Sequence, residues 1–360
     1  MKRKFWMLSI VSIFVLSFAF NHVAHAESAG KADEWLGSDK TEISAHRGAH
    51  VAVPENTAEA MKWAGLLGYG FVEIDIQETK DGQYVLMHDA NIDRTTTGSG
   101  NIKDLTLKEI KSYNVVDADG NETNYKVPTL GEALEEAHKY NLGVNFDGSK
   151  GDWDSKQFVD DVMRIAEEND VLDHSFFVLS NKNIRDQFNA WYPEATVTFL
   201  GDAVKNVDED MKELKKYDSA IYTTSIHNID KAAAEKIKEE NLKLHVYKVD
   251  SAETYAKAME IKPRLIETDV IVPDGVEKLV VLVVQLNKEG VIKDAQAFRT
   301  LKMHLEAIKH FVKSGKDDKA VKHLKNFNKL LDHLISNKII SETTYNTLHI
   351  NADILINQKK

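Results

Sequence analysis

The chain of 360 residues contains no cysteine. This absence excludes metal sites built on thiolates and excludes a cysteine nucleophile. It also excludes a disulfide framework, so stability outside the cell must come from the packed core and from any bound metal. Hydrophobic residues make up 42% of the chain, including 14 Phe, which is enough for a sizeable core.

Long apolar runs are also scarce, and residues 5–20 form the one that stands out. A basic start at residues 2–4 precedes it, and the small-x-small sequence AHA follows at 24–26. This pattern predicts a secretory signal peptide cut before Glu27, and hence a secreted, extracellular protein. An uncleaved anchor is the alternative, although the run is short for a hydrocarbon layer of ~30 Å. After cleavage we expect no stable membrane insertion.

Positive charge is sparse in the body of the chain. Residues 27–276 carry 28 Lys and Arg against 48 Asp and Glu, which argues against nucleic acid as a partner. Residues 277–360 carry 15 basic and 9 acidic residues and are net basic. A basic end favours an anionic surface such as a cell-wall polymer, while the plainer interpretation is a solvated lysine-rich helix face.

Short β-rich runs alternate with helical patterns over residues 41–275. Alternation over this length predicts a parallel α/β sheet, and at this size a TIM-type (β/α) barrel. An open doubly wound sheet is the alternative, but neither GxGxxG nor GxxxxGK[ST] is present. The predicted strands are 42–45, 71–76, 84–87, 143–147, 176–179, 196–200, 220–223, 244–249 and 265–268, and the clearest helices are 57–67, 130–140, 155–168 and 231–240.

From Val276 onward there is no proline, and apolar residues recur at helical spacing on both sides of Gly315. This pattern predicts a small all-α bundle at 276–360 after the barrel. Residues 27–40 are then a linker.

The stretch EISAHRGAHVAVPENTAEA places His46, Arg47 and Gly48 just after the first predicted strand. Loops at this end of each strand build the site in such barrels. Arg47 offers a fork that matches phosphate, and His46 can carry protons near neutral pH. Glu55 and Asn56 are predicted to brace both from the start of the next helix.

Glu73 and Asp75 are two residues apart on the second strand and therefore face the same way. Two adjacent carboxylates inside a barrel repel each other unless a cation lies between them, and oxygen ligands favour Ca²⁺, Mg²⁺ or Mn²⁺ over zinc. If Asp81-Gly82 forms a two-residue hairpin, the register places His88 opposite Asp75. Asp89 is then predicted to orient His88 or a loop, and Arg94 is interpreted as a surface charge.

Later strands contribute further candidates. Asn145 and Asp147 share a parity on the fourth run and are predicted oxygen ligands. Lys150 is a candidate for neutralising phosphate charge, with a solvated turn as the equal alternative. Tyr247 lies near a strand end and can stack on a substrate, and Asp269 follows the last strand.

The order of these motifs resembles the glycerophosphodiester phosphodiesterase family, whose fold is a TIM barrel. The resemblance covers roughly residues 41–274 and is most specific in its first half. The motifs are His46-Arg47-Gly48, Pro54-Glu55-Asn56-Thr57, Glu73-Ile74-Asp75, Thr79-Lys80-Asp81-Gly82, His88-Asp89, Arg94-Thr95-Thr96-Thr97-Gly98-Ser99-Gly100 and Pro128-Thr129-Leu130.

The resemblance implies hydrolysis of small glycerophosphodiesters to glycerol 3-phosphate and an alcohol, with one divalent cation, Ca²⁺ or Mg²⁺. It implies that His46 and His88 are the acid/base pair, that Arg47 holds phosphate, and that Glu73 and Asp75 bind the metal.

The second half departs from the family pattern. The usual Glu on the fourth strand is Asp147 here, and Lys150 comes one residue late. Tyr247 stands where the family often has Trp. The C-terminal stretch resembles the small helical FIMAH module of some secreted bacterial hydrolases.

Three alternatives fit the same sequence. In the first, the same barrel acts on teichoic acid, and in the second it acts on lysophospholipid or sphingomyelin. In the third, the chain is a catalytically degenerate wall-binding module.

Overall fold

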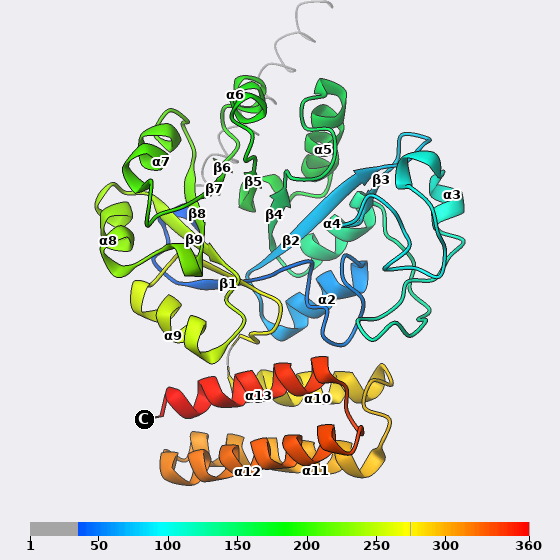
Figure 1. Ribbon diagram of the computed structural model, residues 1–360, viewed down its shortest axis with the longest axis vertical. Coiled ribbons are helices and arrows are strands. Elements are labelled where there is room, and N and C mark those ends of the chain that lie inside the picture. The colour runs from blue at the N-terminus through cyan, green and yellow to red at the C-terminus, as the bar shows by residue number, and fades with distance from the viewer. Residues whose placement is uncertain (1–34, 274, 360) are drawn as a thin grey trace, which may run out of the picture.

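The computed structural model describes residues 35–273 and 275–359, and the predicted signal peptide lies outside them. Ten strands and a series of helices alternate along the chain, with helices alone after Thr268 (Figure 1). Within the described residues, no helix is both long and apolar enough to cross a membrane. The strands are β1 Glu42–Ala45, β2 Phe71–Glu78, β3 Tyr84–Leu86, β4 Gly143–Asp147, β5 Ser175–Val178, β6 Val197–Thr198, β7 Leu200–Gly201, β8 Ile221–Ser225, β9 Lys243–Tyr247 and β10 Leu265–Thr268.

Helices pack around the outside of the strands and then form a separate layer below them in Figure 1. The α-helices are α2 Ala58–Leu67, α3 Leu107–Ile110, α4 Leu130–Lys139, α5 Lys156–Glu168, α6 Lys182–Trp191, α7 Val207–Leu214, α8 Lys231–Glu239, α9 Ala252–Ile261, α10 Val276–Lys288, α11 Ala295–Lys313, α12 Asp317–Ser336 and α13 Glu342–Asn357.

The strands form a nearly closed parallel barrel. Their order is β6-β5-β4-β2-β1-β10-β9-β8-β7, so the first strand pairs with the last. A parallel bridge links Val197 in β6 to Ala220, directly before β8, and so nearly closes the barrel. An open doubly wound sheet would leave its edges apart, and the prediction of a TIM-type barrel followed by helices is confirmed.

The third strand extends β2 as an antiparallel hairpin, and the predicted register of this hairpin was wrong by one residue. Ile76 pairs with Leu86, and the N–H of Met87 donates to the C=O of Asp75 at 3.0 Å. The turn contains three residues, 80–82, because Gly82 adopts a φ of +70°. A left-handed glycine closes three-residue hairpin loops. Asp75 therefore lies opposite Met87, and His88 follows beyond the end of the strand.

Local signals explain why the helices begin where they do. Thr57 caps α2 by accepting from the N–H of Ala60, which orders the chain directly after the PENT motif. Thr129 caps α4 in a capping box with Glu132. These caps therefore fix the start of the two helices that precede β2 and β4, the strands with the candidate acidic residues.

Aromatic side chains fill the end of the barrel opposite the polar loops. Phe71 and Phe176 are fully buried there, and Trp35 packs on Phe71 with ring centroids 5.2 Å apart. The ring of His174 meets Phe71 edge-on at 4.5 Å. Because these apolar side chains fill one end, the barrel is open at the carboxyl ends of its strands.

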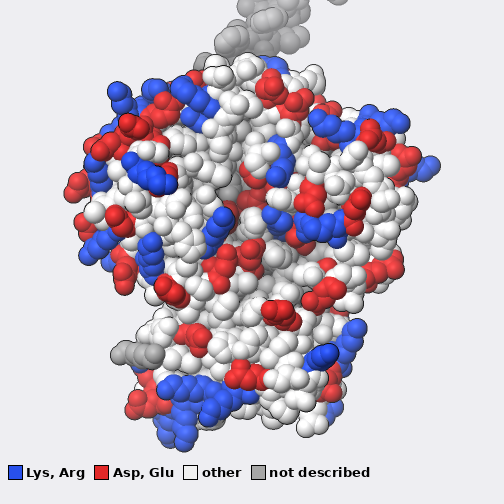
Figure 2. Space-filling view, in the orientation of Figure 1, with Lys and Arg blue, Asp and Glu red and all other residues white. Residues whose placement is uncertain are grey.

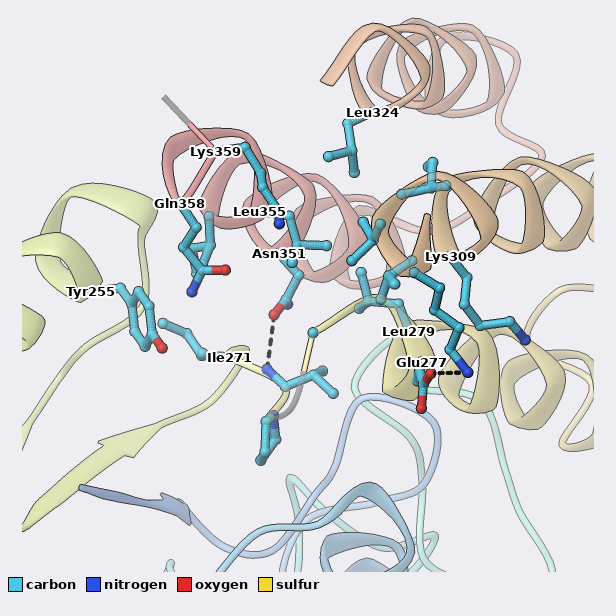
Figure 3. A pocket seen from close by; sticks show the side chains of 18 residues that line it. Tyr255, Ile271, Glu277, Leu279, Lys309, Leu324, Asn351, Leu355, Gln358 and Lys359 are labelled. Atoms are coloured by element: carbon cyan, nitrogen blue, oxygen red, sulfur yellow. Dashed lines mark hydrogen bonds and ion pairs between the residues drawn. The ribbon is translucent and has the colours of Figure 1, made fainter. Parts of the chain in front are cut away.

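The helical module, defined as α10–α13, packs against α2 and α9 of the barrel (Figure 1). Asn351 on α13 joins the two parts: its Oδ1 accepts from the N–H of Val272 at 2.9 Å, and its Nδ2 donates to the C=O of Val270 at 2.7 Å. Figure 3 shows the bond accepted by Oδ1 of Asn351, at a cavity of about 500 Å³ between the parts. Lys278 adds a bond from its Nζ to the C=O of Leu66.

Candidate active site

The first candidate side chains lie in the turn after β1. Gly48 has a φ of +78°, and a Cβ there would approach the Cβ of Ala60 on α2 to 2.7 Å. Only glycine therefore lets the turn lie against this helix. Arg47 also has a positive φ, of 55°, and its backbone N–H donates to Oε2 of Glu73 at 2.9 Å. The turn thus ties the loop after β1 to the acidic strand β2.

His46 is held through one ring nitrogen. Its Nδ1 lies 2.7 Å from Oδ1 of Asp269, while its Nε2 is 3.8 Å from Oε2 of Glu73. Burial alone lowers the pKa of His46, but the hydrogen bond to Asp269 and the charges of Glu73 and Glu267 outweigh it and raise the pKa to about 10. Nε2 is left facing the acidic residues, and the ring orientation is fixed.

His88 is held in the same way by its neighbour. Its Nδ1 lies 2.7 Å from Oδ1 of Asp89, and Nε of Arg94 donates to Oδ2 of Asp89 at 2.7 Å. The hydrogen bond from Arg94 lowers the pKa of Asp89, which keeps this carboxylate ionised. Glu55 accepts from both Arg94 and Arg47 and joins the two loops. Arg94, which the sequence left as a surface charge, therefore belongs to this network.

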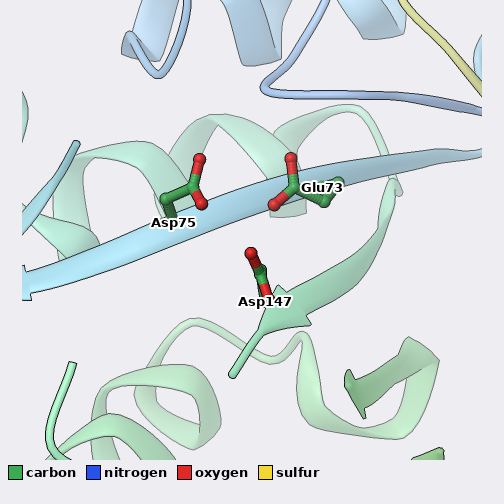
Figure 4. Close-up of side chains that lie close together, drawn as sticks. All are labelled: Glu73, Asp75 and Asp147. Atoms are coloured by element: carbon green, nitrogen blue, oxygen red, sulfur yellow. The ribbon is translucent and has the colours of Figure 1, made fainter. Parts of the chain in front are cut away.

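Three carboxylates converge at the ends of β2 and β4. Figure 4 shows Glu73, Asp75 and Asp147 directed toward one another, and one oxygen from each lies within 4.8 Å of the others. Parallel pairing of β2 with β4 sets Asp75 beside Asp147 and Glu73 beside Asn145. The register alone therefore brings the three acids together.

These carboxylates fit a divalent cation. Glu73 and Asp75 are buried, and Oδ1 of Asp75 has no hydrogen-bond partner among the described residues. Burial and the charge of Asp75 raise the pKa of Glu73 well above its usual value. Burial also raises the pKa of Asp75, although the hydrogen bond from Asn56 and the nearby Arg47 and His88 oppose this rise. Buried acids with an unsatisfied oxygen are stabilised when a hard cation binds them.

Asn56 and Arg47 support this cluster, whereas the sequence predicted that Glu55 and Asn56 brace His46 and Arg47. Nδ2 of Asn56 donates to Oδ2 of Asp75 at 2.9 Å, and Nε of Arg47 lies 3.6 Å from the same oxygen. That buried Nε has no hydrogen-bond partner among the described residues, so a donor remains available beside the cluster.

The site opens into a cavity of about 750 Å³ at the carboxyl ends of the strands. Figure 2 shows this face hollowed at its centre, with acidic side chains along the hollow and lysine and arginine side chains beside it. Tyr247, half-buried at the end of β9, lines the cavity together with His46 and Asp147. Lys150 is half-buried after β4 and is not among the described residues that line it.

Several lining or contacting residues were missed by the sequence. Nε2 of His50 lies 3.1 Å from Oδ1 of Asp269, so this carboxylate is shared by two histidines. Asn145, a predicted oxygen ligand, donates from Nδ2 to Oε2 of Glu267 at 2.8 Å, and its buried Oδ1 has no hydrogen-bond partner among the described residues. Lys248, next to Tyr247, lines the cavity. Strand parity was the one signal that could have identified Glu267 as a site residue. His50 and Lys248 offered no such signal, because they lie in irregular segments.

Family comparisons match two parts of the chain. Residues 46–272 match the glycerophosphoryl diester phosphodiesterase family, and residues 276–357 match the FIMAH domain. A glycerophosphodiester phosphodiesterase of Caldanaerobacter subterraneus is 42% identical over 113 residues, or 31% of this chain and 46% of that protein. One of Bacillus subtilis is 36% identical over 148 residues, or 39% of this chain and 49% of that protein. The chain thus spans less than half the length of these curated relatives.

Solved structures share the fold. An Oleispira antarctica phosphodiesterase, in complex with the product sn-glycerol-3-phosphate, aligns with a TM-score of 0.57 and 23% identity, covering 63% of this chain and 92% of that one. A glycerophosphodiester phosphodiesterase from Agrobacterium tumefaciens aligns with a TM-score of 0.55 and 22% identity, covering 64% and 96%.

Proposed function

Because the chain belongs to the glycerophosphoryl diester phosphodiesterase family, we propose that it hydrolyses small glycerophosphodiesters to glycerol 3-phosphate and an alcohol. The observation that carries the proposal is that His46, Arg47, Glu73 and Asp147 line one cavity. Asp75 lies beside Asp147, and hydrogen bonds through Asp89, Arg94 and Glu55 link His88 to Arg47. A degenerate wall-binding barrel would have no need to keep all of these groups.

Glu73, Asp75 and Asp147 would hold one divalent cation, Ca²⁺ or Mg²⁺. Such a cation acts as a Lewis acid that polarises a phosphoryl oxygen and acidifies a bound hydroxyl. Asn56 keeps Asp75 directed at this point, and Arg47, which lines the cavity, would bind phosphate.

The two histidines divide the proton transfers. One imidazole takes the proton from the glycerol hydroxyl next to the phosphate as that oxygen attacks phosphorus. The bond from phosphorus to the alcohol oxygen breaks, and the other imidazole protonates this oxygen. Water then opens the cyclic phosphate and yields glycerol 3-phosphate. Asp269 and Asp89 hold Nδ1 of His46 and His88, so the Nε2 atoms carry these protons.

The direct test is release of glycerol 3-phosphate from glycerophosphocholine by residues 27–360 with added Ca²⁺, with Mg²⁺ and with EDTA. Metal-dependent release supports the proposal. A folded sample that releases none with either metal would overturn it.

The proposal includes secretion of the enzyme. A basic start, an apolar run and an AHA sequence at 24–26 support cleavage before Glu27. The net basic residues 277–360 support association with an anionic wall polymer. A mature N-terminus other than Glu27 on the exported protein would contradict the first part. Binding to isolated walls that salt does not weaken would contradict the second.

A further inference from the structure

Strained backbone at this molecule's open face points to one more functional residue. Among residues 35–273 and 275–359, eight residues other than glycine have a positive φ. Five of them end helices, where the left-handed conformation is a normal cap: Asn141, Asp170, Asn241, Lys262 and Lys338. The other three are Arg47, Asn56 and Lys248, and all belong to the loops of the candidate site.

This conformation costs a residue with a side chain about 1–2 kcal/mol, and it persists only where the surroundings fix it. Contacts with Glu73 and Asp75 fix Arg47 and Asn56. Lys248 is fixed from both sides by the barrel, because Tyr247 before it is paired in β9 and Val249 after it is fully buried. The N–H of Val249 donates to the C=O of Glu267 at 3.2 Å. The side chain of Lys248 is thereby set at the cavity.

The Lys248 ammonium has no partner at this cavity. It is exposed and forms no ion pair or hydrogen bond with the described residues. Its Nζ lies 5.8 Å from the ring centroid of Tyr247, within the range of a cation–π interaction. The other permanent cation there, Arg47, is paired with Glu55. The acids that line the cavity already accept hydrogen bonds: Glu73 from the N–H of Arg47, Asp147 from Ser149, Asp250 from Thr268, Glu267 from Asn145 and Asp269 from His46.

The position of Lys248 separates it from the reacting phosphate. It follows β9, which lies three steps from the acidic strand β2 in the order β2-β1-β10-β9. Each step is about 4.8 Å around the barrel wall, so Lys248 enters the cavity from a different side than the three carboxylates. A cavity of about 750 Å³ has room for a further part of the substrate on that side, since small-molecule sites range over about 300–1,000 Å³.

We propose that Lys248 binds an anionic group on the alcohol portion of the diester, so that the preferred substrates carry a second negative charge beyond the scissile phosphate. Tyr247 lies under that portion. The inference rests on the proposed hydrolysis of glycerophosphodiesters and narrows its substrate class. The second anion is a phosphate, as in an oligomer of glycerol phosphate, or a carboxylate.

Three matched substrates test the inference. Glycerophosphoglycerol has a neutral alcohol, its terminally phosphorylated form carries a phosphate, and glycerophosphoglycerate carries a carboxylate. We expect the wild-type kcat/KM to be higher for the phosphorylated or the carboxylated diester than for the neutral one, and whichever leads identifies the anion. Lys248→Met should reduce this anionic-to-neutral ratio about 10-fold, mainly through KM, because the contact is the same in ground and transition states.

Control variants separate charge from backbone strain. Lys248→Arg should retain most of the ratio, because it keeps the charge. Lys262→Met also replaces a left-handed lysine, at the end of α9 and outside the cavity, and should leave the ratio unchanged. Raising the salt concentration should reduce the ratio in the wild type but not in Lys248→Met, because salt screens exposed charges.

The outcomes are distinguishable. A ratio that Lys248→Met leaves intact, or that falls equally in Lys262→Met, would overturn the inference while the hydrolysis of the neutral diester upholds the proposed function. Failure of the folded wild type to hydrolyse any of the three would overturn both.

Discussion

Asn56 and Asp75 bind each other twice: Nδ2 of Asn56 donates to Oδ2 of Asp75 at 2.9 Å, and the N–H of Asp75 donates to Oδ1 of Asn56 at 3.3 Å. Both residues are buried. This reciprocal pair sets the carboxylate of Asp75 toward Glu73 and Asp147 before any cation binds.

Replacing Asn56 should therefore weaken metal binding. We expect Asn56→Ala to reduce Ca²⁺ affinity about 10- to 100-fold, the usual effect of losing a group that orients a metal ligand. Calorimetric titration with Ca²⁺ measures it. Asn141→Ala is the matched control, because Asn141 has nearly the same φ, 53° against 52°, at the end of α4. If Asn56→Ala bound Ca²⁺ as tightly as Asn141→Ala, Asn56 would not orient the metal ligand.

Each histidine depends on its carboxylate partner. We expect His46→Ala and His88→Ala to reduce kcat about 10²- to 10⁴-fold, the usual contribution of general acid–base catalysis. Asp269→Asn should reduce kcat by a smaller factor, because it removes the hydrogen-bonded charge that holds Nδ1 of His46. His138→Ala, at an exposed site on α4, is the control. Near-normal turnover in either histidine variant would rule out the two-histidine mechanism.

His174 should make the stability depend on pH. Burial lowers the pKa of its partly buried ring to about 4, so between pH 6.5 and 4 the unfolded chain binds more protons than the folded one. Above about pH 6.5 the ring is neutral in both states and this contribution to the free energy of unfolding is fully present. As the pH falls toward 4, the free energy of unfolding decreases by about 2 to 3 kcal/mol. Urea unfolding at several pH values should show a smaller loss in His174→Gln. An identical pH slope in both proteins would disprove this assignment.

The contact between barrel and module should depend on Asn351. Asn351→Ala leaves the N–H of Val272 and the C=O of Val270 without their partner, and we expect a loss of about 2 to 4 kcal/mol in the free energy of unfolding. Urea unfolding measures it, and Asn337→Ala at the exposed end of α12 should cost under about 1 kcal/mol. If the two variants were equally stable, the junction would not rest on Asn351.

Regular segments of the fold were predictable from local pattern. The bounds of β1, β4 and β10 agree with the predicted runs, because each is a short apolar segment between clear turn signals. The run 196–200 splits into β6 and β7, since the strand order ends there and no neighbour pairs with Phe199 in a named strand.

Side-chain placement was predictable where it followed from strand parity. Glu73, Asp75 and Asp147 share a face because alternate residues in paired parallel strands do. His88 was expected beside Asp75 through a hairpin register that differs by one residue, since the conformation of Gly82 decides loop length. The roles of His50, Arg94 and Lys248 depend on how loops fold over one another, which no local pattern encodes.

The most direct test of the central claim is ³¹P NMR of glycerophosphocholine during incubation with residues 27–360 and Ca²⁺. The account predicts that the diester signal is replaced by that of glycerol 3-phosphate, and that EDTA prevents the change. Accumulation of phosphocholine instead would mean that the other ester bond breaks, and would contradict attack by the neighbouring glycerol hydroxyl.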